Sequence, residues 1–328
     1  MPTIYGVDVS KNHLDIYGCN QANQIVRKRI KNTLSAIETF LLSIEKDVLI
    51  CAEFTGVYSE LLAFTCYHLS VNIVLINGYT LKHSFGDVKG KSDAIDALKI
   101  WEYGKRFADK LRYFQPDENI IHELKELHNL RNQLVKQRKM ILTSQTARGM
   151  ATANSMFAHR AAQQIVEQLT QQILSLEKEM ITIISDSHLR NNMELVTSIK
   201  GIGPITAIEL LIISGNFKKL TSGRKLAAYA GVCPYPNQSG NITYRSRVHP
   251  RSDRKLKSVL YMAAVAVCRV NKEFRMYRDR KLSEGKHYFL VMNNVINKLL
   301  RIIYALIDSG QPFDISYLPV DPRFGKKD

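Results

Sequence analysis

Four carboxylates near the start of the chain could together bind a divalent metal: Asp8, Glu53, Asp93 and Asp96. Carboxylate oxygens are the ligands that hard cations such as Mg²⁺ or Mn²⁺ prefer. Paired ions of this kind stabilise the attacking and leaving oxygens of phosphoryl transfer. Each acid alone could be a cap or a surface charge, and Asp93 suits a helix start merely because of the dipole. Together the four predict a metal site for phosphodiester chemistry.

The elements that must position these carboxylates alternate as in an RNase H-like α/β fold. Short β-rich runs and amphipathic segments predict the order βββαβαβ, followed by a helix that places Asp93 and Asp96 on one face. In such a sheet, the strands that carry Asp8 and Glu53 are neighbours. The predicted strands are Ile4–Val9, Leu14–Cys19, Gln24–Ile30, Val48–Ala52 and Val71–Ile76, and the predicted helices are Thr33–Glu45, Tyr58–Leu69 and Ser92–Gly104.

The opening Gly6-Val-Asp8-Val-Ser10-Lys11 also resembles the phosphate loop of actin-like ATPases and sugar kinases. Those proteins need a second Asp-Gly-rich phosphate motif and an adenosine motif later in the chain. The sequence contains neither, so the metal site is the better interpretation.

Two segments in the middle of the chain carry apolar residues at heptad-like spacing, residues 117–143 and 166–183. Such helices could form a coiled-coil hairpin, a dimer seam, or a face that packs on a neighbouring domain. Between them, Ser144–Ala162 has little apolar periodicity and is predicted to be a mobile link.

Positive charge is concentrated in the C-terminal part. The net charge is +16, and residues 188–328 hold 24 Lys and Arg against 10 Asp and Glu. This excess favours a polyanion as partner, nucleic acid in the first place and an anionic membrane surface as the minor alternative.

Two C-terminal segments could contact nucleic-acid phosphates. The first, Ser198-Ile-Lys-Gly-Ile-Gly-Pro204, has the form of a helix-hairpin-helix loop, in which Lys200, Gly201 and Gly203 would meet phosphate at a helix N-terminus. An ordinary helix connection is the alternative. The second is a run of basic residues that could bind backbone phosphates or be a solvated face: Arg245, Arg247, Arg251, Arg254, Lys255 and Lys257.

The chain shows no sign of export, membrane insertion or cysteine chemistry. Its N-terminus lacks a basic region followed by an apolar stretch, and no apolar run has the length and purity of a membrane span. The five cysteines are scattered, without a C-x-x-C pair, so neither disulfides nor a zinc site is expected. We expect a cytoplasmic protein.

Several strings occur in the order and spacing found in one family: YGVDVSKNHLDI, CAEFTGVYSELL, KGKSDAIDALKI, SIKGIGPITA, LAAYAGVCPYPNQSG and LKSVLYMAA. Over nearly its whole length the chain resembles the DEDD transposases of the insertion sequence 110 family, which include the Piv-type DNA invertases. The resemblance implies a RuvC-like metal domain over residues 1–115 with the four carboxylates as ligands. It also implies a coiled-coil element over 116–187 and a mainly α-helical transposase domain over 188–328.

The resemblance further implies a serine nucleophile that forms a phosphoserine link to DNA. The matching residue is Ser239, within Gln238-Ser239-Gly240. The chain departs from many relatives after Gly240, which makes Thr243 and Ser246 alternative nucleophiles. A serine hydroxyl needs a base or a metal to activate it, and the metal held by the carboxylates could do so.

By the same resemblance, the partners would be donor and target DNA and a structured bridge RNA whose loops pair with both. The active form would be a homo-oligomer, a dimer or a tetramer. The leading hypothesis is therefore an RNA-guided, Mg²⁺-dependent transposase or recombinase. A RuvC-like junction resolvase that uses activated water, a Piv-type site-specific invertase, and a non-enzymatic nucleic-acid-binding protein with a degenerate metal site remain as alternatives.

Overall fold

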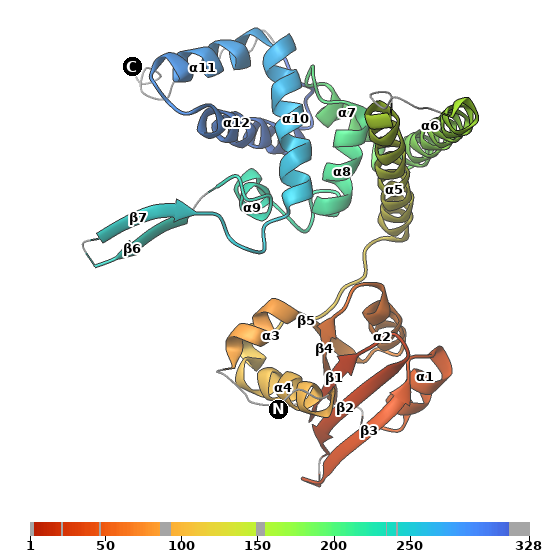
Figure 1. Cartoon of the computed structure of the whole chain (residues 1–328). Coiled ribbons are helices and arrows are strands. Elements are labelled where there is room, and N and C mark those ends of the chain that lie inside the picture. Colours follow the sequence, from red (N-terminus) through yellow and green to blue (C-terminus); the bar gives the residue numbers. More distant parts are fainter. Residues whose placement is uncertain are drawn as a thin grey trace. The chain divides into compact units, whose positions relative to one another are not determined.

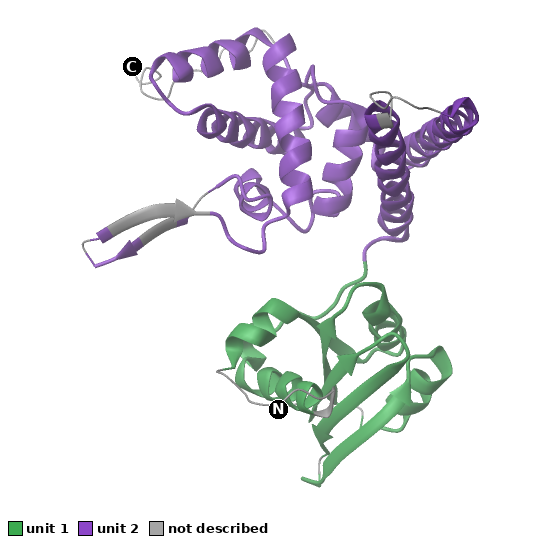
Figure 2. Ribbon diagram, in the orientation of Figure 1, with its two compact units in different colours: residues 1–116 green, residues 117–328 purple. Residues whose placement is uncertain are grey.

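The computed structural model describes residues 3–20, 22–45, 47–85, 93–148, 155–233, 235–240 and 242–314. The chain divides into two compact units, residues 1–116 and 117–328, each with its own hydrophobic core (Figure 1, Figure 2). Each unit is considered by itself below.

Unit 1 is built on a five-stranded sheet with the strand order β3-β2-β1-β4-β5. The first three strands are antiparallel, and β4 and β5 are parallel to β1, which is the arrangement of an RNase H-like sheet. The predicted order of strands is confirmed. The strands are β1 (Thr3–Val9), β2 (His13–Cys19), β3 (Ile25–Lys31), β4 (Val48–Phe54) and β5 (Asn72–Asn77).

Helices cover both faces of this sheet. On one face, α1 and α2 pack over the buried side chains of Val7, Leu14 and Ile50. On the other face, α4 packs over Ile4, Cys51 and the neighbouring apolar residues. The bounds are α1 (Leu34–Leu42), α2 (Val57–His68), α3 (Gly78–Ser84), α4 (Asp93–Arg106) and a 3₁₀ turn at Ala108–Lys110. The short helix α3 was not predicted, because its seven residues are too few for an apolar period to emerge.

A glycine lets α4 lie directly on β1. A Cβ added at Gly6 would stand 2.3 Å from both the Ala97 carbonyl oxygen and the Trp101 nitrogen. Near the other end of α4, a Cβ at Gly104 would meet Ile4 and Cys51. The helix therefore runs antiparallel to β1, and its first turn extends toward the C-terminal end of that strand.

Unit 2 begins with two long antiparallel helices, α5 (Asn119–Arg148) and α6 (Met156–Ser185). Contacts between them pair residues in opposite order along the chain, from Arg131 with Glu177 to Arg138 with Thr170. The pair is a helical hairpin within one chain. The predicted bounds of the link, Ser144–Ala162, are wrong, because α5 continues to Arg148 and α6 begins at Met156. Backbone hydrogen bonds extend both helices into this segment although it has no apolar stripe. Residues 149–154 lie outside the described part.

The base of this hairpin joins the core of a helical domain. Ile121 and Leu124 of α5 and Met180 and Ile184 of α6 are buried among the apolar residues of the later helices. Unit 2 thus includes the middle helices. The remaining helices are α7 (Arg190–Thr197), α8 (Pro204–Ser214), α9 (Gly223–Tyr229), α10 (Arg254–Val270), α11 (Lys272–Ser283) and α12 (Tyr288–Ser309).

Among the described helices, α12 has the length and apolar content that could cross a membrane. One side of it, from Val291 through Leu299 to Ile303, is buried in the core of unit 2. A core helix of this kind explains the apolar run in the sequence.

Between α9 and α10 the chain forms a two-stranded antiparallel hairpin, β6 (Tyr235–Ser239) and β7 (Ile242–Arg247) (Figure 1). The sequence did not predict it. Its described side chains Tyr235, Gln238, Ser239 and Ile242 are exposed, so no apolar alternation marks the strands.

Candidate active site

The two strand carboxylates lie side by side on the α4 face of the sheet. Val7 pairs with Ala52 in the parallel β1–β4 ladder, so the next residues along, Asp8 and Glu53, are neighbours. Side chains alternate between the faces of a strand. Asp8 therefore shares the face of Gly6, and Glu53 shares the face of Cys51, which α4 covers. Both residues are half-buried.

The start of α4 brings further carboxylates to this place. Because α4 runs antiparallel to β1, its first turn, with Asp93 and Asp96, lies at the same edge of the sheet as Asp8. Asp96 accepts a hydrogen bond from Lys99 at 3.0 Å. Asp93 is the first residue of α4, as predicted. Its side chain lies outside the described part of the structure.

The negative charge of Asp96 acts on the carboxyl group of Glu53. Burial of the Glu53 carboxyl and the nearby charge of Asp96 both raise the pKa of Glu53 above its ordinary value of 4.5. Glu53 also packs against the backbone where α3 begins, since a Cβ added at Gly78 would stand 2.2 Å from Glu53 Oε1. Unit 1 thus holds two half-buried carboxylates that repel each other.

This repulsion is what a bound divalent cation would relieve. The donors are carboxylate oxygens, which suit Mg²⁺ or Mn²⁺ better than zinc. Among the described side chains, no three His, Cys, Asp or Glu residues are close enough to form a complete ligand group. Asp8 and Glu53 are neighbours on the sheet, and Asp96 of α4 lies near Glu53, so three of the four carboxylates gather in one region of unit 1. The metal-ligand role of all four carboxylates stays a prediction.

A fifth carboxylate on this face was missed from the sequence. Asp15 of β2 pairs with Asp8 across the antiparallel ladder, and its side chain is 14% exposed. Arg29 of β3 donates to it through Nε at 2.8 Å and through a second guanidinium nitrogen. Asp15 lies two residues before Tyr17, whose ring packs against Trp101 of α4, so both side chains lie on the face that α4 covers. The Asp15–Arg29 pair borders the metal face and adds a positive group beside it.

Ser239 lies at the tip of the β6–β7 hairpin. It pairs with Ile242, so two residues form the turn; the first, Gly240, has φ 56°, as two-residue hairpin turns require. Ser239 is exposed, and no histidine or carboxylate among the described residues hydrogen-bonds to its hydroxyl. The side chains of Thr243 and Ser246, the alternative nucleophiles, lie outside the described part.

The base of the hairpin is fixed in unit 2. A Cβ added at Gly231, which has φ 68°, would stand 2.6 Å from Ser252 and 2.7 Å from Val248, so the strands enter and leave at one point. On the entering side, the Asn297 amide donates to the Val232 carbonyl at 3.3 Å. The hairpin is therefore a projecting arm with a held base and an exposed serine at its end.

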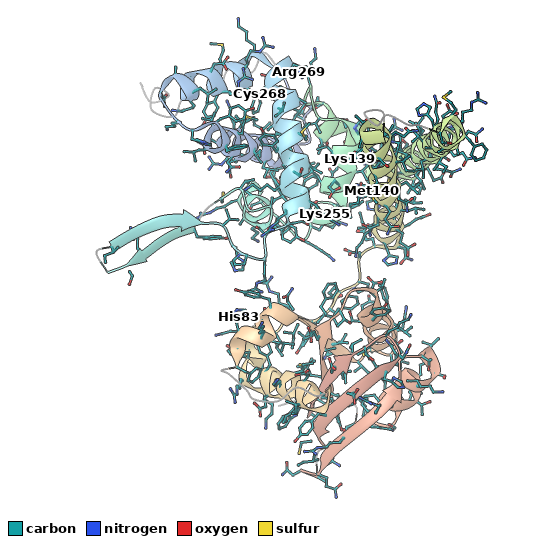
Figure 3. The ribbon with its side chains drawn as sticks, viewed as in Figure 1. His83, Lys139, Met140, Lys255, Cys268 and Arg269 are labelled. Atoms are coloured by element: carbon teal, nitrogen blue, oxygen red, sulfur yellow. The ribbon has the colours of Figure 1, made fainter. Side chains whose placement is uncertain are left out.

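Three of the predicted basic residues lie on the first turn of α10, which begins just after the hairpin: Arg254, Lys255 and Lys257. Figure 3 shows Lys255 at this end of α10 and Arg269 at the other. Asp253 caps the helix by accepting from the backbone nitrogens of Lys255 and Leu256. Cations at a helix N-terminus oppose its dipole, so this placement favours an external anion.

Some residues of the predicted basic run make other contacts, and the side chains of others lie outside the described part of the structure. Lys257 donates to the Gly231 carbonyl at 3.1 Å and so helps to hold the hairpin base. Arg251 is exposed in the loop before α10. The side chains of Arg245 and Arg247, on β7, lie outside the described part.

The glycine loop between α7 and α8 has a packing role at one glycine. Gly201 has φ 105°, and a Cβ there would stand 2.8 Å from the backbone of Val267 in α10. Gly203, the N-cap of α8, faces open space, and Lys200 is exposed. Close helix packing thus explains Gly201, whereas phosphate contact by Lys200 and Gly203 stays a prediction.

Two family models match the chain in succession. A DEDD transposase model of the IS110 type matches residues 5–149, the segment that contains the four carboxylates. The model described as "Transposase IS116/IS110/IS902 family" matches residues 193–279, the segment that contains Ser239 and the start of α10. The chain belongs to this transposase family. The predicted resemblance is confirmed.

Curated relatives within and around this transposase family cover most of the chain. The "Pilin gene-inverting protein" of Moraxella lacunata is 29% identical over 272 residues, 80% of each chain. The "Transposase for insertion sequence element IS1328" of Yersinia enterocolitica is 24% identical over 347 residues, which is 95% of this chain and 98% of that protein.

Solved structures of RuvC are similar to about a third of the chain. A Thermus thermophilus RuvC structure in complex with Holliday junction substrate covers 35% of this transposase-family chain and all of its own, with 12% identity and a TM-score of 0.26.

Proposed function

We propose that this protein is an RNA-guided DNA transposase or recombinase in which Ser239 attacks DNA and the carboxylates of unit 1 bind Mg²⁺ or Mn²⁺. The observation that carries the proposal is the position of Ser239, exposed at the end of a hairpin whose base is fixed. A serine in an incidental surface turn would not need such an anchored arm. The partners would be donor DNA, target DNA and a bridge RNA, gathered by a dimer or a tetramer.

In the proposed reaction, Ser239 Oγ forms a bond to a DNA phosphorus, and the bond from that phosphorus to one deoxyribose oxygen breaks. The Oγ proton passes to a base or to solvent, and the departing oxygen becomes a hydroxyl. A hydroxyl of another DNA end then attacks the phosphoserine and releases Ser239. The number of phosphoester bonds is conserved, so rejoining needs no ATP.

The chain's own residues would prepare this exchange. Asp8, Glu53 and Asp96 would hold the cation, with Asp93 as the fourth predicted ligand, and a bound cation would lower the pKa of the attacking hydroxyl and polarise the phosphate. The cations on the first turn of α10 would fix the DNA backbone beside the arm.

A direct test is recombination between donor and target plasmids in the presence of RNA that copurifies with the protein. We expect Ser239→Ala and Asp96→Asn to abolish recombination, and a denaturing gel to reveal a protein–DNA adduct that depends on Ser239. Full activity of either variant would remove that residue from the site. Sequencing of the copurified RNA would identify the guide by its complementarity to both DNA partners, and absence of such an RNA would contradict RNA guidance.

A junction resolvase that uses activated water is the second candidate, because the carboxylate face of unit 1 needs no serine for hydrolysis. It predicts nicked DNA without an adduct and full cutting by Ser239→Ala. An invertase, the activity named for the Moraxella relative, would instead invert a segment flanked by its own sites. DNA binding without Mg²⁺-dependent strand cleavage would favour the non-enzymatic alternative.

A further inference from the structure

Unit 2 contains a cavity of about 600 Å³ beside the base of the β6–β7 hairpin. Its walls are the polar side of α12, Tyr277 of α11, and Val232 and Cys233, which lead into β6. The volume lies within the range of small-molecule and nucleotide pockets. None of the roles assigned above uses this cavity.

One wall residue, Asn297, is already used by the fold. Its amide nitrogen donates to the Val232 and Asn293 carbonyls, and its oxygen accepts from the Cys233 thiol at 2.9 Å. Asn297 therefore links α12 to the segment that enters the hairpin. The cavity and the arm that carries Ser239 share this wall.

Two further asparagines offer unused hydrogen-bonding groups to the cavity. Asn293 and Asn294 are half-buried, and within the described structure neither side-chain amide has a protein partner. Each amide presents donors and an acceptor, the groups that pair with the edge of a nucleobase.

Two cations in the wall also lack an anion. The Lys298 amino group lies 5.3 Å from the Phe274 ring centre and 5.5 Å from that of Tyr277, and Arg301 is exposed. Within the described structure, no carboxylate pairs with Lys298 or Arg301. Uncompensated Lys and Arg beside an aromatic ring suit a phosphate next to a stacked base.

We infer that this cavity binds a nucleotide of the DNA strand that becomes joined to Ser239. Asn293 and Asn294 would contact the base, and Lys298 and Arg301 the phosphate. The inference rests on the proposed function, because the phosphoserine bond is what tethers DNA to this unit. Cys233 and Ser239 are six positions apart in the sequence, a reach of at most about 22 Å. At about 3.4 Å of axis per phosphate on one strand, this corresponds to about six nucleotides.

The test measures binding of a fluorescent single-stranded DNA 20-mer, and of the RNA of the same sequence, to the full-length protein. We expect Asn293→Ala/Asn294→Ala and Arg301→Ala each to weaken DNA binding about 10-fold. Arg269→Ala, which removes the same charge at the far end of α10, should leave the affinity unchanged (Figure 3). If the double variant has a lowered Tm, the Arg301→Ala variant still tests DNA binding, because Arg301 is exposed.

Cys233 provides an independent readout, because it lines the cavity and is partly accessible. In a Cys19→Ser background, DNA carrying a disulfide-activated base should cross-link to Cys233, and Cys233→Ser should abolish the cross-link.

The outcomes separate the two proposals. Unchanged DNA affinity in both cavity variants together with no cross-link would overturn the inference, and a loss confined to RNA would assign the cavity to RNA instead. Failure of the Ser239 adduct with wild-type protein would overturn the proposed chemistry, whereas the binding measurements do not depend on strand cleavage.

Discussion

At the scale of single residues, Ser239 and Glu53 mark the two halves of the proposed chemistry. Ser239 is exposed on a strand end in unit 2, and Glu53 is half-buried beside Asp96 in unit 1. Their environments differ because a nucleophile must reach its substrate, whereas a metal ligand must hold a charge in place.

Replacing Ser239 tests the nucleophile alone. We expect Ser239→Ala to bind DNA like the wild type but to lose adduct formation by about 10⁴-fold or more, as other enzymes do without their nucleophile. Denaturing gels with end-labelled DNA measure the adduct. Thr243→Ala, on the facing strand, should retain it; if instead Thr243→Ala loses the adduct and Ser239→Ala keeps it, the nucleophile is Thr243.

The raised pKa of Glu53 makes the stability of unit 1 depend on pH. Because the folded state binds this proton more tightly than the unfolded state, the stabilisation is present below pH 4.5 and is lost as pH rises through the folded pKa. Glu53→Gln should therefore raise the Tm by a few degrees at pH 7 in metal-free buffer, and not at pH 4. Calorimetry checks this, with Glu38→Gln of α1 as control.

Added Mg²⁺ should reduce or reverse the Tm difference between Glu53→Gln and the wild type at pH 7. It should raise the Tm of the wild type at pH 7 more than that of Glu53→Gln, since binding to the folded state stabilises it by mass action. Equal shifts in both proteins would mean that Glu53 is not a ligand.

At the scale of elements, α4 owes its position to Gly6. A methyl group at Gly6 would overlap the helix backbone, so we expect Gly6→Ala to destabilise unit 1 by about 1–3 kcal/mol, the usual cost of overpacking, and to displace Asp96 from Glu53. Urea unfolding and Mg²⁺ titration measure the two effects. Ser35→Ala, on exposed α1 surface, is the control, and an unaffected Gly6→Ala would contradict the close packing.

The loop between α7 and α8 contains a residue with a packing role, Gly201, next to a predicted phosphate contact, Lys200. Gly201→Ala should cost about 2 kcal/mol in the unfolding of unit 2, because it strains a positive φ and meets the Val267 backbone. Lys200→Ala, at an exposed site, should keep the stability but weaken DNA binding at low salt. If both variants alter only stability, the loop is an ordinary helix connection.

How much the sequence predicts depends on how deeply an element is buried. The strands of unit 1 were predictable, because apolar runs such as Val48–Ala52 are buried, and the neighbouring positions of Asp8 and Glu53 follow from the strand order. The β6–β7 hairpin was not predictable, because its exposed residues carry no apolar period. Asp15 was missed because its relation to Asp8 depends on the register of an antiparallel pair, and the cavity on α12 depends on tertiary packing.

At the scale of the whole molecule, each unit has its own core, so each should fold alone. The fragment 117–328 should bind DNA, and its affinity should fall about 10³-fold between 50 and 200 mM salt as counterions are released. The fragment 1–116 should bind Mg²⁺ with little DNA affinity. Fluorescence anisotropy and calorimetry distinguish the fragments, and salt-independent binding by 117–328 would contradict an electrostatic interface.

The exposed hairpin has one further consequence. With no buried face among its described side chains, its strand register is set by the turn at Gly240 rather than by a hydrophobic pattern. A one-residue insertion or deletion in β6 would keep Ser239 beside the turn but change how Ser239 is oriented relative to the base of the arm, without disturbing any core. The arm therefore acts as a molecular ruler, and among homologues its length should tolerate change less than its composition.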